Sequence, residues 1–134
     1  MTAKIVLLAT TSLLLGACDV LDIGQACTLE ARPAITVRLL DATTGESPAA
    51  DTGRIVVRDG VYADSATVSS FVFEQDVRIG LAHERRGAYS VEVEVPGYER
   101  WTTDDVHVGQ TDDGCHVDTE LVTAELQPSS DAGE

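Results

Sequence analysis

Residues 87–98 read GAYSVEVEVPGY, and their apolar and polar side chains alternate. Every second residue from Tyr89 to Val95 is apolar, and the residues between them are serine or glutamate. An extended chain places alternate side chains on opposite faces, so this pattern predicts a strand with one buried and one wet face. Pro96 and Gly97 follow directly and predict a turn at its end.

Weaker copies of the same alternation recur along the chain from Ile35 onward, separated by turn signals such as Thr44-Gly45 and Asp59-Gly60. The apolar positions of these copies are Ile35, Val37 and Leu39; Ile55 and Val57; Phe71 and Phe73; Val77, Ile79 and Leu81; Val106 and Val108; and Val117, Thr119 and Leu121. About seven short strands with this spacing predict an all-β chain folded as a single β-sandwich.

The last of these strands carries an irregularity. Its apolar phase slips by one residue near Leu121, from positions 117, 119 and 121 to positions 122, 124 and 126. A β-bulge or a strand that crosses between the two sheets would explain the slip.

Two stretches resemble the carboxypeptidase regulatory-like, transthyretin-like β-sandwich family. Residues 37–48 resemble its first strand and turn, and residues 87–98 fit its G-x-Y-x-V-x-V-x-x-x-G-Y strand and turn. The resemblance spans residues 33–127 and implies an Ig-like or transthyretin-like sandwich. Residues 61–70 replace the short link usual in this family, so the strand pairing between residues 60 and 73 stays open.

The N-terminus has the features of an export signal. An apolar run of 11 residues, Ile5 to Leu15, follows Lys4 and is too short to span a bilayer as a helix, which takes about 20 residues. Residues 15–18, LGAC, resemble the lipobox of bacterial lipoproteins. The resemblance implies cleavage before Cys18 and attachment of fatty acyl chains such as palmitate to this cysteine.

These features divide the chain into four parts. We expect a signal peptide over residues 1–17, a lipid-anchored tether over 18–32, the sandwich over 33–127 and a flexible tail over 128–134. The expected location is the cell envelope, with the domain in the periplasm or outside the cell. Asp19 resembles the inner-membrane retention signal of enteric bacteria, but the choice between inner and outer membrane stays open.

The chain has three cysteines. If Cys18 carries the lipid, Cys27 and Cys115 remain as an even pair in an oxidising compartment, and we predict a disulfide between them. The alternative is two buried free thiols.

The charge of the chain limits its partners. It has 23 acidic against 9 basic residues and a formal net charge of -14. Nucleic acid is excluded as a partner, because binding it requires clustered cations that displace counterions. The same charge repels anionic headgroups, so we expect the lipid alone to hold the protein at the membrane.

No motif in the sequence indicates catalysis. The chain lacks G-x-S-x-G, the His-x-x-Glu ligand pair of zinc carboxypeptidases, and the C-terminal Tyr-Arg-Gly-Ser of transthyretin-like hydroxyisourate hydrolases. We therefore expect neither enzymatic activity nor a cofactor. His107 and His116 are candidate metal ligands together with the aspartates around them, but both lie in the polar phase of their strands and are expected to be solvated.

Tyr98 and Trp101 are the candidate binding surface, because aromatic side chains beside a turn can grip a partner; packing of Trp101 inside the sandwich is the favoured alternative. We expect a non-catalytic envelope lipoprotein whose sandwich binds a protein or a glycan. The competing hypothesis is a small ligand-binding or metal-binding lipoprotein that uses the acidic end containing the histidines.

Lipidation is directly testable. We expect Cys18→Ala to abolish incorporation of a labelled fatty acid, because the thiol that carries the lipid is gone. The measurement is metabolic labelling followed by gel analysis of the purified protein. Persistent labelling of the variant would show that the lipobox interpretation is wrong.

Overall fold

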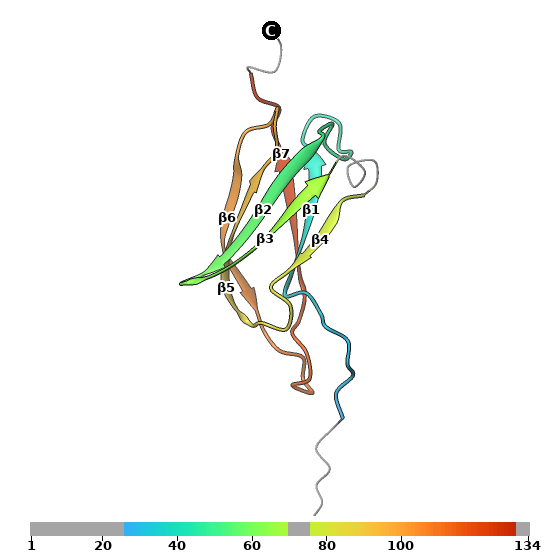
Figure 1. Cartoon of the computed structure of the whole chain (residues 1–134), viewed down its shortest axis with the longest axis vertical. Helices are drawn as coiled ribbons and strands as arrows, with labels where there is room; N and C mark the ends of the chain where they lie inside the picture. The colour runs from blue at the N-terminus through green and yellow to red at the C-terminus, as the bar shows by residue number, and fades with distance from the viewer. Residues whose placement is uncertain (1–25, 70–75, 131–134) are drawn as a thin grey trace, which may run out of the picture.

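The computed structural model describes residues 26–69 and 76–130, which form seven strands and no helix (Figure 1). The strands are β1 (Ile35–Asp41), β2 (Thr52–Asp59), β3 (Tyr62–Ser69), β4 (Arg78–Leu81), β5 (Gly87–Glu94), β6 (Trp101–Val108) and β7 (Glu120–Leu126). Within these residues, no helix is long and apolar enough to cross a membrane. The expected signal peptide, Cys18, and the strand expected around Phe71 and Phe73 lie outside the described residues.

The strands form two sheets that share one core. The three-stranded sheet has the order β4-β1-β7, and the four-stranded sheet has the order β3-β2-β5-β6. Neighbouring strands run antiparallel except β1 and β7, which run parallel. The predicted single β-sandwich of about seven strands is confirmed.

The alternating stretch at residues 87–94 supplies the centre of the core. Tyr89, Val91 and Val93 of β5 are each at most 1% exposed. Full burial of a valine side chain contributes roughly 1.5–3 kcal/mol of free energy. The Tyr89 hydroxyl donates a hydrogen bond of 2.6 Å to the carbonyl oxygen of Arg85, which satisfies its one buried polar group. The other sheet contributes Ile35, Val37, Leu39, Ala124 and Leu126.

The pairing left open between residues 60 and 73 is partly resolved, because residues 62–69 form a full strand. β2 and β3 make a hairpin in which Asp59 pairs with Tyr62. Gly60 has a φ of +58° in its two-residue loop, a conformation that glycine adopts without strain. β3 lies at the sheet edge, and its inward residues, Tyr62, Asp64, Ala66 and Val68, show no continuous apolar run. The residues between them are serine, threonine or alanine and face water, so the sequence of β3 resembles a loop.

The phase slip near Leu121 is a crossing between the sheets. Val117 is buried and pairs with Gln110, which lies two residues after the end of β6 in the four-stranded sheet. The chain then joins the other sheet as β7, whose inward residues are Val122, Ala124 and Leu126. The expectation that Leu121 faces inward is wrong: it is 54% exposed.

The sandwich has two different ends (Figure 1). The described chain enters at the end where β1 begins and where the turns at residues 60–61 and 82–86 lie, which we call the entry end. The β1–β2 and β5–β6 connections and residue 130 lie at the opposite, far end. There the start of the expected flexible tail is held in place, because the backbone N–H of Ser129 donates to the carbonyl of Gly97 and Tyr98 pairs with Pro128.

Two adjacent leucines of β1 test which face of this strand points into the core. Leu39 is fully buried, whereas Leu40 lies on the outer face. We expect Leu39→Ala to lower the free energy of unfolding by about 2–5 kcal/mol because it leaves a cavity in the core, and Leu40→Ala to lower it by much less. Urea unfolding of both variants measures this difference. Equal decreases in the free energy of unfolding would contradict an inward Leu39 and an outward Leu40.

Candidate functional site

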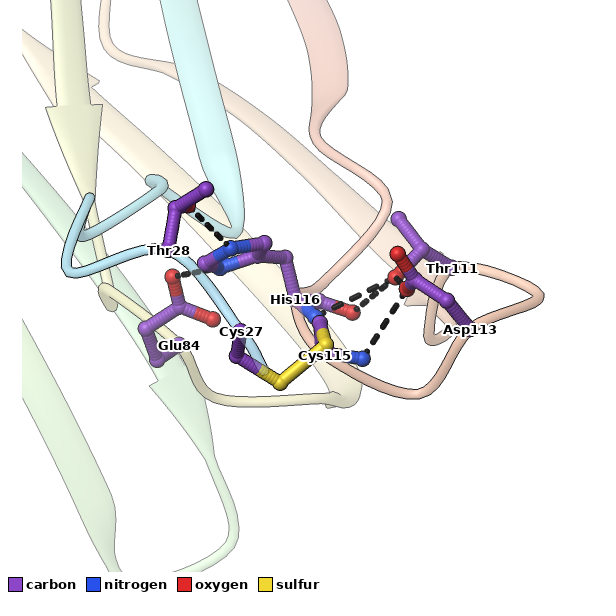
Figure 2. Close-up of a disulfide and its surroundings, with 7 residues drawn as sticks. All are labelled: Cys27, Thr28, Glu84, Thr111, Asp113, Cys115 and His116. Atoms are coloured by element: carbon purple, nitrogen blue, oxygen red, sulfur yellow. Dashed lines mark hydrogen bonds and ion pairs between the residues drawn. A yellow bond between two sulfur atoms is a disulfide. The ribbon is translucent and has the colours of Figure 1, made fainter. Parts of the chain in front are cut away.

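The predicted disulfide between Cys27 and Cys115 is present (Figure 2). The S–S distance is 2.08 Å and the two Cα atoms lie 5.2 Å apart. The bond joins the segment that enters the domain to the connection between β6 and β7, across 88 residues of sequence. It therefore fixes the incoming chain to the entry end of the sandwich.

His116, which follows Cys115, is buried and not solvated as the sequence suggested. It is 6% exposed. Its Nδ1 lies 2.8 Å from Oε1 of Glu84, and its Nε2 lies 2.9 Å from Oγ1 of Thr28 (Figure 2). The expectation failed because residues 111–116 form an irregular turn, in which alternation no longer tells the buried face from the wet one.

Glu84 is held rigidly in the turn between β4 and β5. Its backbone has a φ of +53°, and its Oε1 also accepts a hydrogen bond of 2.7 Å from the backbone N–H of Arg32. The bond from Arg32 and the bond to His116 hold the pKa of Glu84 below its ordinary value. The carboxylate therefore stays ionised beside the imidazole.

The structure does not bring the candidate metal ligands together. His107 is exposed on β6, where it pairs with Ala88, and both ring nitrogens of His116 already have partners. Asp105 occupies a bulge of β6 at a φ of +60°. Among the described residues, no three histidine, cysteine or acidic side chains are grouped as a metal site.

Tyr98 has a structural bond at the far end. Its hydroxyl donates to Oδ2 of buried Asp41 at 2.8 Å and accepts the N–H of Ala49 at 3.0 Å. Oδ1 of Asp41 accepts the N–H groups of Thr43 and Thr44. These bonds, chiefly the one from Tyr98, lower the pKa of Asp41 below its ordinary value of 3.8.

An open cleft of about 630 Å³ lies beside Tyr98 at the far end, over the ends of β2, β3 and β5. Its lining residues are Thr52, Gly53, Arg54, Thr67, Glu94, Val95, Pro96, Tyr98 and Arg100. Trp101 is not among them. It is half-buried against the core, so only Tyr98 of the predicted aromatic pair lines the cleft.

The charges in the cleft are unevenly paired. Arg54 lies directly across from Glu94 in the β2–β5 register, but Glu94 makes its ion pair with Arg100. Arg100 also approaches Glu92 at 3.7 Å. Arg54 also lines the cleft, and within residues 26–69 and 76–130 it has no acidic group at ion-pair distance.

Sequence reasoning missed Arg54, Arg100, Thr28 and Glu84. The two arginines stand next to strand ends with no motif around them. Thr28 could have been found, because it follows Cys27 as His116 follows Cys115, so the predicted disulfide already places the two side chains near each other.

No protein-family model matches the sequence, and no curated protein matches it. Among solved structures, the chain is similar to a Bacteroides uniformis protein described as a "putative carbohydrate binding protein". The two are 16% identical, the match covers 72% of this chain and 42% of that one, and the TM-score is 0.44.

The Asp41 bonds predict an acid dependence of stability. A lowered folded-state pKa contributes stability that is present above the ordinary pKa of 3.8 and is lost as pH falls through the folded value. We expect Asp41→Asn to lower the Tm by several degrees at pH 7, with a difference from wild type that shrinks below about pH 4.

Thermal unfolding of both proteins from neutral to acid pH measures this effect. Comparing them at each pH removes the contributions of Asp76, Glu84 and Asp113, whose pKa values are also lowered. A Tm difference that does not change with pH would show that the ionised Asp41 carboxylate is not what stabilises the far end.

Proposed function

We propose that this protein is a lipid-anchored envelope protein whose sandwich binds a glycan through the far-end cleft. The observation that carries the proposal is the position of the cleft, at the end opposite the disulfide that fixes the incoming chain. Strands of seven or eight residues separate the two ends by about 25 Å. A lipid on Cys18 would then leave the cleft facing away from the membrane.

The chemistry of the cleft suits a glycan. The guanidinium groups of Arg54 and Arg100 and the carboxylate of Glu94 offer donors and acceptors for neighbouring sugar hydroxyls, and the hydroxyls of Thr52 and Thr67 add to them. The ring of Tyr98 and the side chains of Val95 and Pro96 supply the apolar part. Such a mixture of apolar walls and a few polar groups is typical of small-molecule and sugar sites.

The charge pattern supports the same choice. In a chain with a net charge of -14, the cleft contains two arginines and one glutamate. The cleft is therefore one place where an uncharged or acidic sugar meets no excess of negative charge. A stable protein interface buries about 800 Å² on each partner, which is more surface than a single cleft of this kind offers.

Arg54 and Arg100 are the residues to change. We expect Arg54→Ala and Arg100→Ala each to weaken glycan binding about tenfold or more, because each removes charge-assisted hydrogen bonds. The assay uses the full chain in detergent micelles against immobilised bacterial polysaccharides, with dissociation constants for any that bind. Arg78→Ala is the matched control, because Arg78 is also exposed but lies on the other sheet in an ion pair with Asp76.

Unchanged affinity in both cleft variants would move binding to another surface. Absence of binding to every polysaccharide, together with crosslinking to an envelope protein in cells, would show that the partner is a protein and that the glycan proposal is wrong.

A further inference from the structure

The hydrogen-bonded chain Thr28–His116–Glu84 lies outside the cleft, and the proposed function leaves it without a role. Oγ1 of Thr28 lies 2.9 Å from Nε2 of His116, and Nδ1 of His116 lies 2.8 Å from Glu84 Oε1 (Figure 2). These are a hydroxyl, a base and a carboxylate that orients the base, in the order used by nucleophilic hydrolases. We propose that Thr28 is an activated nucleophile that accepts acyl groups from neutral carboxylic esters.

The hydrogen bonds assign the protons. An ionised carboxylate only accepts, so the Glu84 contact places the imidazole proton on Nδ1. Nε2 then presents its lone pair to Thr28, whose hydroxyl must donate. The threonine proton therefore points at a base, which is the arrangement that nucleophilic attack requires.

Each of the three groups is held in place. The disulfide fixes Cys27 and Cys115, the residues directly before Thr28 and His116. Glu84 is held by the N–H of Arg32 in a turn with the left-handed backbone already described, and strained positions of this kind concentrate at functional sites. His116 is buried, whereas Thr28 is exposed and open to a substrate.

A hollow of about 370 Å³ adjoins the hydroxyl. Two donors on its wall could stabilise the oxyanion that forms during attack. The backbone N–H of Leu29, the residue after the nucleophile, makes no hydrogen bond to the described residues. Gln110 accepts a bond from Arg86 through Oε1, which leaves its amide nitrogen as the second donor.

The charge around the hollow defines the class of ester. Glu30 and Glu84 line it. Two arginines reach its rim: Arg32 forms an ion pair of 3.7 Å with Glu30, and Arg86 donates to Gln110. Both cations already have partners, so the hollow offers no free positive charge to an anionic ester, and the substrates are small uncharged esters.

The chemistry balances without a cofactor. Oγ1 of Thr28 attacks the ester carbonyl while Nε2 of His116 takes the threonine proton. The tetrahedral intermediate then collapses. Nε2 gives the proton to the departing alkoxide, which leaves as an alcohol. The acyl group now forms an ester with Thr28. Water, activated by the same nitrogen, attacks this ester and releases the carboxylic acid and the free threonine.

The test incubates the full chain in detergent with p-nitrophenyl acetate and follows release of p-nitrophenol, with peptide mass spectrometry locating the acetyl group. We expect the acetyl group on the hydroxyl of Thr28. The variant Thr28→Ser should still be acetylated at this position, because serine also carries a hydroxyl. Thr28→Ala should reduce the release rate about 100-fold, to the uncatalysed level, since general-base assistance is typically worth 10²–10⁴. The sequence has a single lysine, Lys4, so background acylation is low.

Two further variants separate catalysis from stability. Glu84→Gln should slow acetylation about tenfold or more while melting curves confirm that the protein is folded. Thr119→Ala removes another exposed hydroxyl, which donates to the carbonyl of Pro33, and should leave the rate unchanged. The absence of an acetyl group on Thr28 of the wild type, or equal rates in the wild type and Thr28→Ala, would overturn the proposal. The hydrogen bonds among Thr28, His116 and Glu84 would then have a structural role only. Either result is independent of whether the cleft binds a glycan.

Discussion

The Cys27–Cys115 disulfide is the constraint on which the arrangement of this molecule depends. It joins two segments that no strand pairing would hold together, the chain entering the domain and the irregular turn before β7. A cross-link over so long a loop stabilises chiefly by restricting the unfolded chain, by about 4 kcal/mol in the chain-entropy account. It also bears on the local chemistry, because it joins the residues directly before Thr28 and His116, whose side chains lie 2.9 Å apart.

The division between two ends follows from this bond. At the entry end, the disulfide, His116 and Glu84 form a rigid, acidic region beside a small hollow. At the far end, the buried Asp41 carboxylate ties Tyr98 to the end of β1 and shapes the wall of the larger cleft. The strands separate these sites, which places the proposed anchor and the proposed ester chemistry at the entry end and the proposed glycan site at the far end.

Alternation in the sequence predicted the parts of the fold that bury one full face. β5 and β1 were predictable because Tyr89, Val91 and Leu39 repeat every second residue. β3 was not, because an edge strand buries little and tolerates Asp64 and Ala66 inside. Outside the strands the rule fails, so His116 was expected in water, although it lies under the incoming chain. Glu84 had no signal at all, since only folding brings its turn to His116.

The most direct test of this account measures which end of the protein lies next to the membrane. Two singly labelled proteins are prepared, with the fluorophore at Val61 in the entry-end hairpin or at Pro96 beside the cleft. Each lipidated protein is reconstituted in vesicles whose lipid headgroups carry a quencher. If a lipid on Cys18 holds the entry end at the membrane, quenching is strong at position 61 and weak at position 96. Both signals are lost when Cys18→Ala releases the protein. Equal quenching at the two positions, or stronger quenching at 96, would contradict a cleft held away from the anchor.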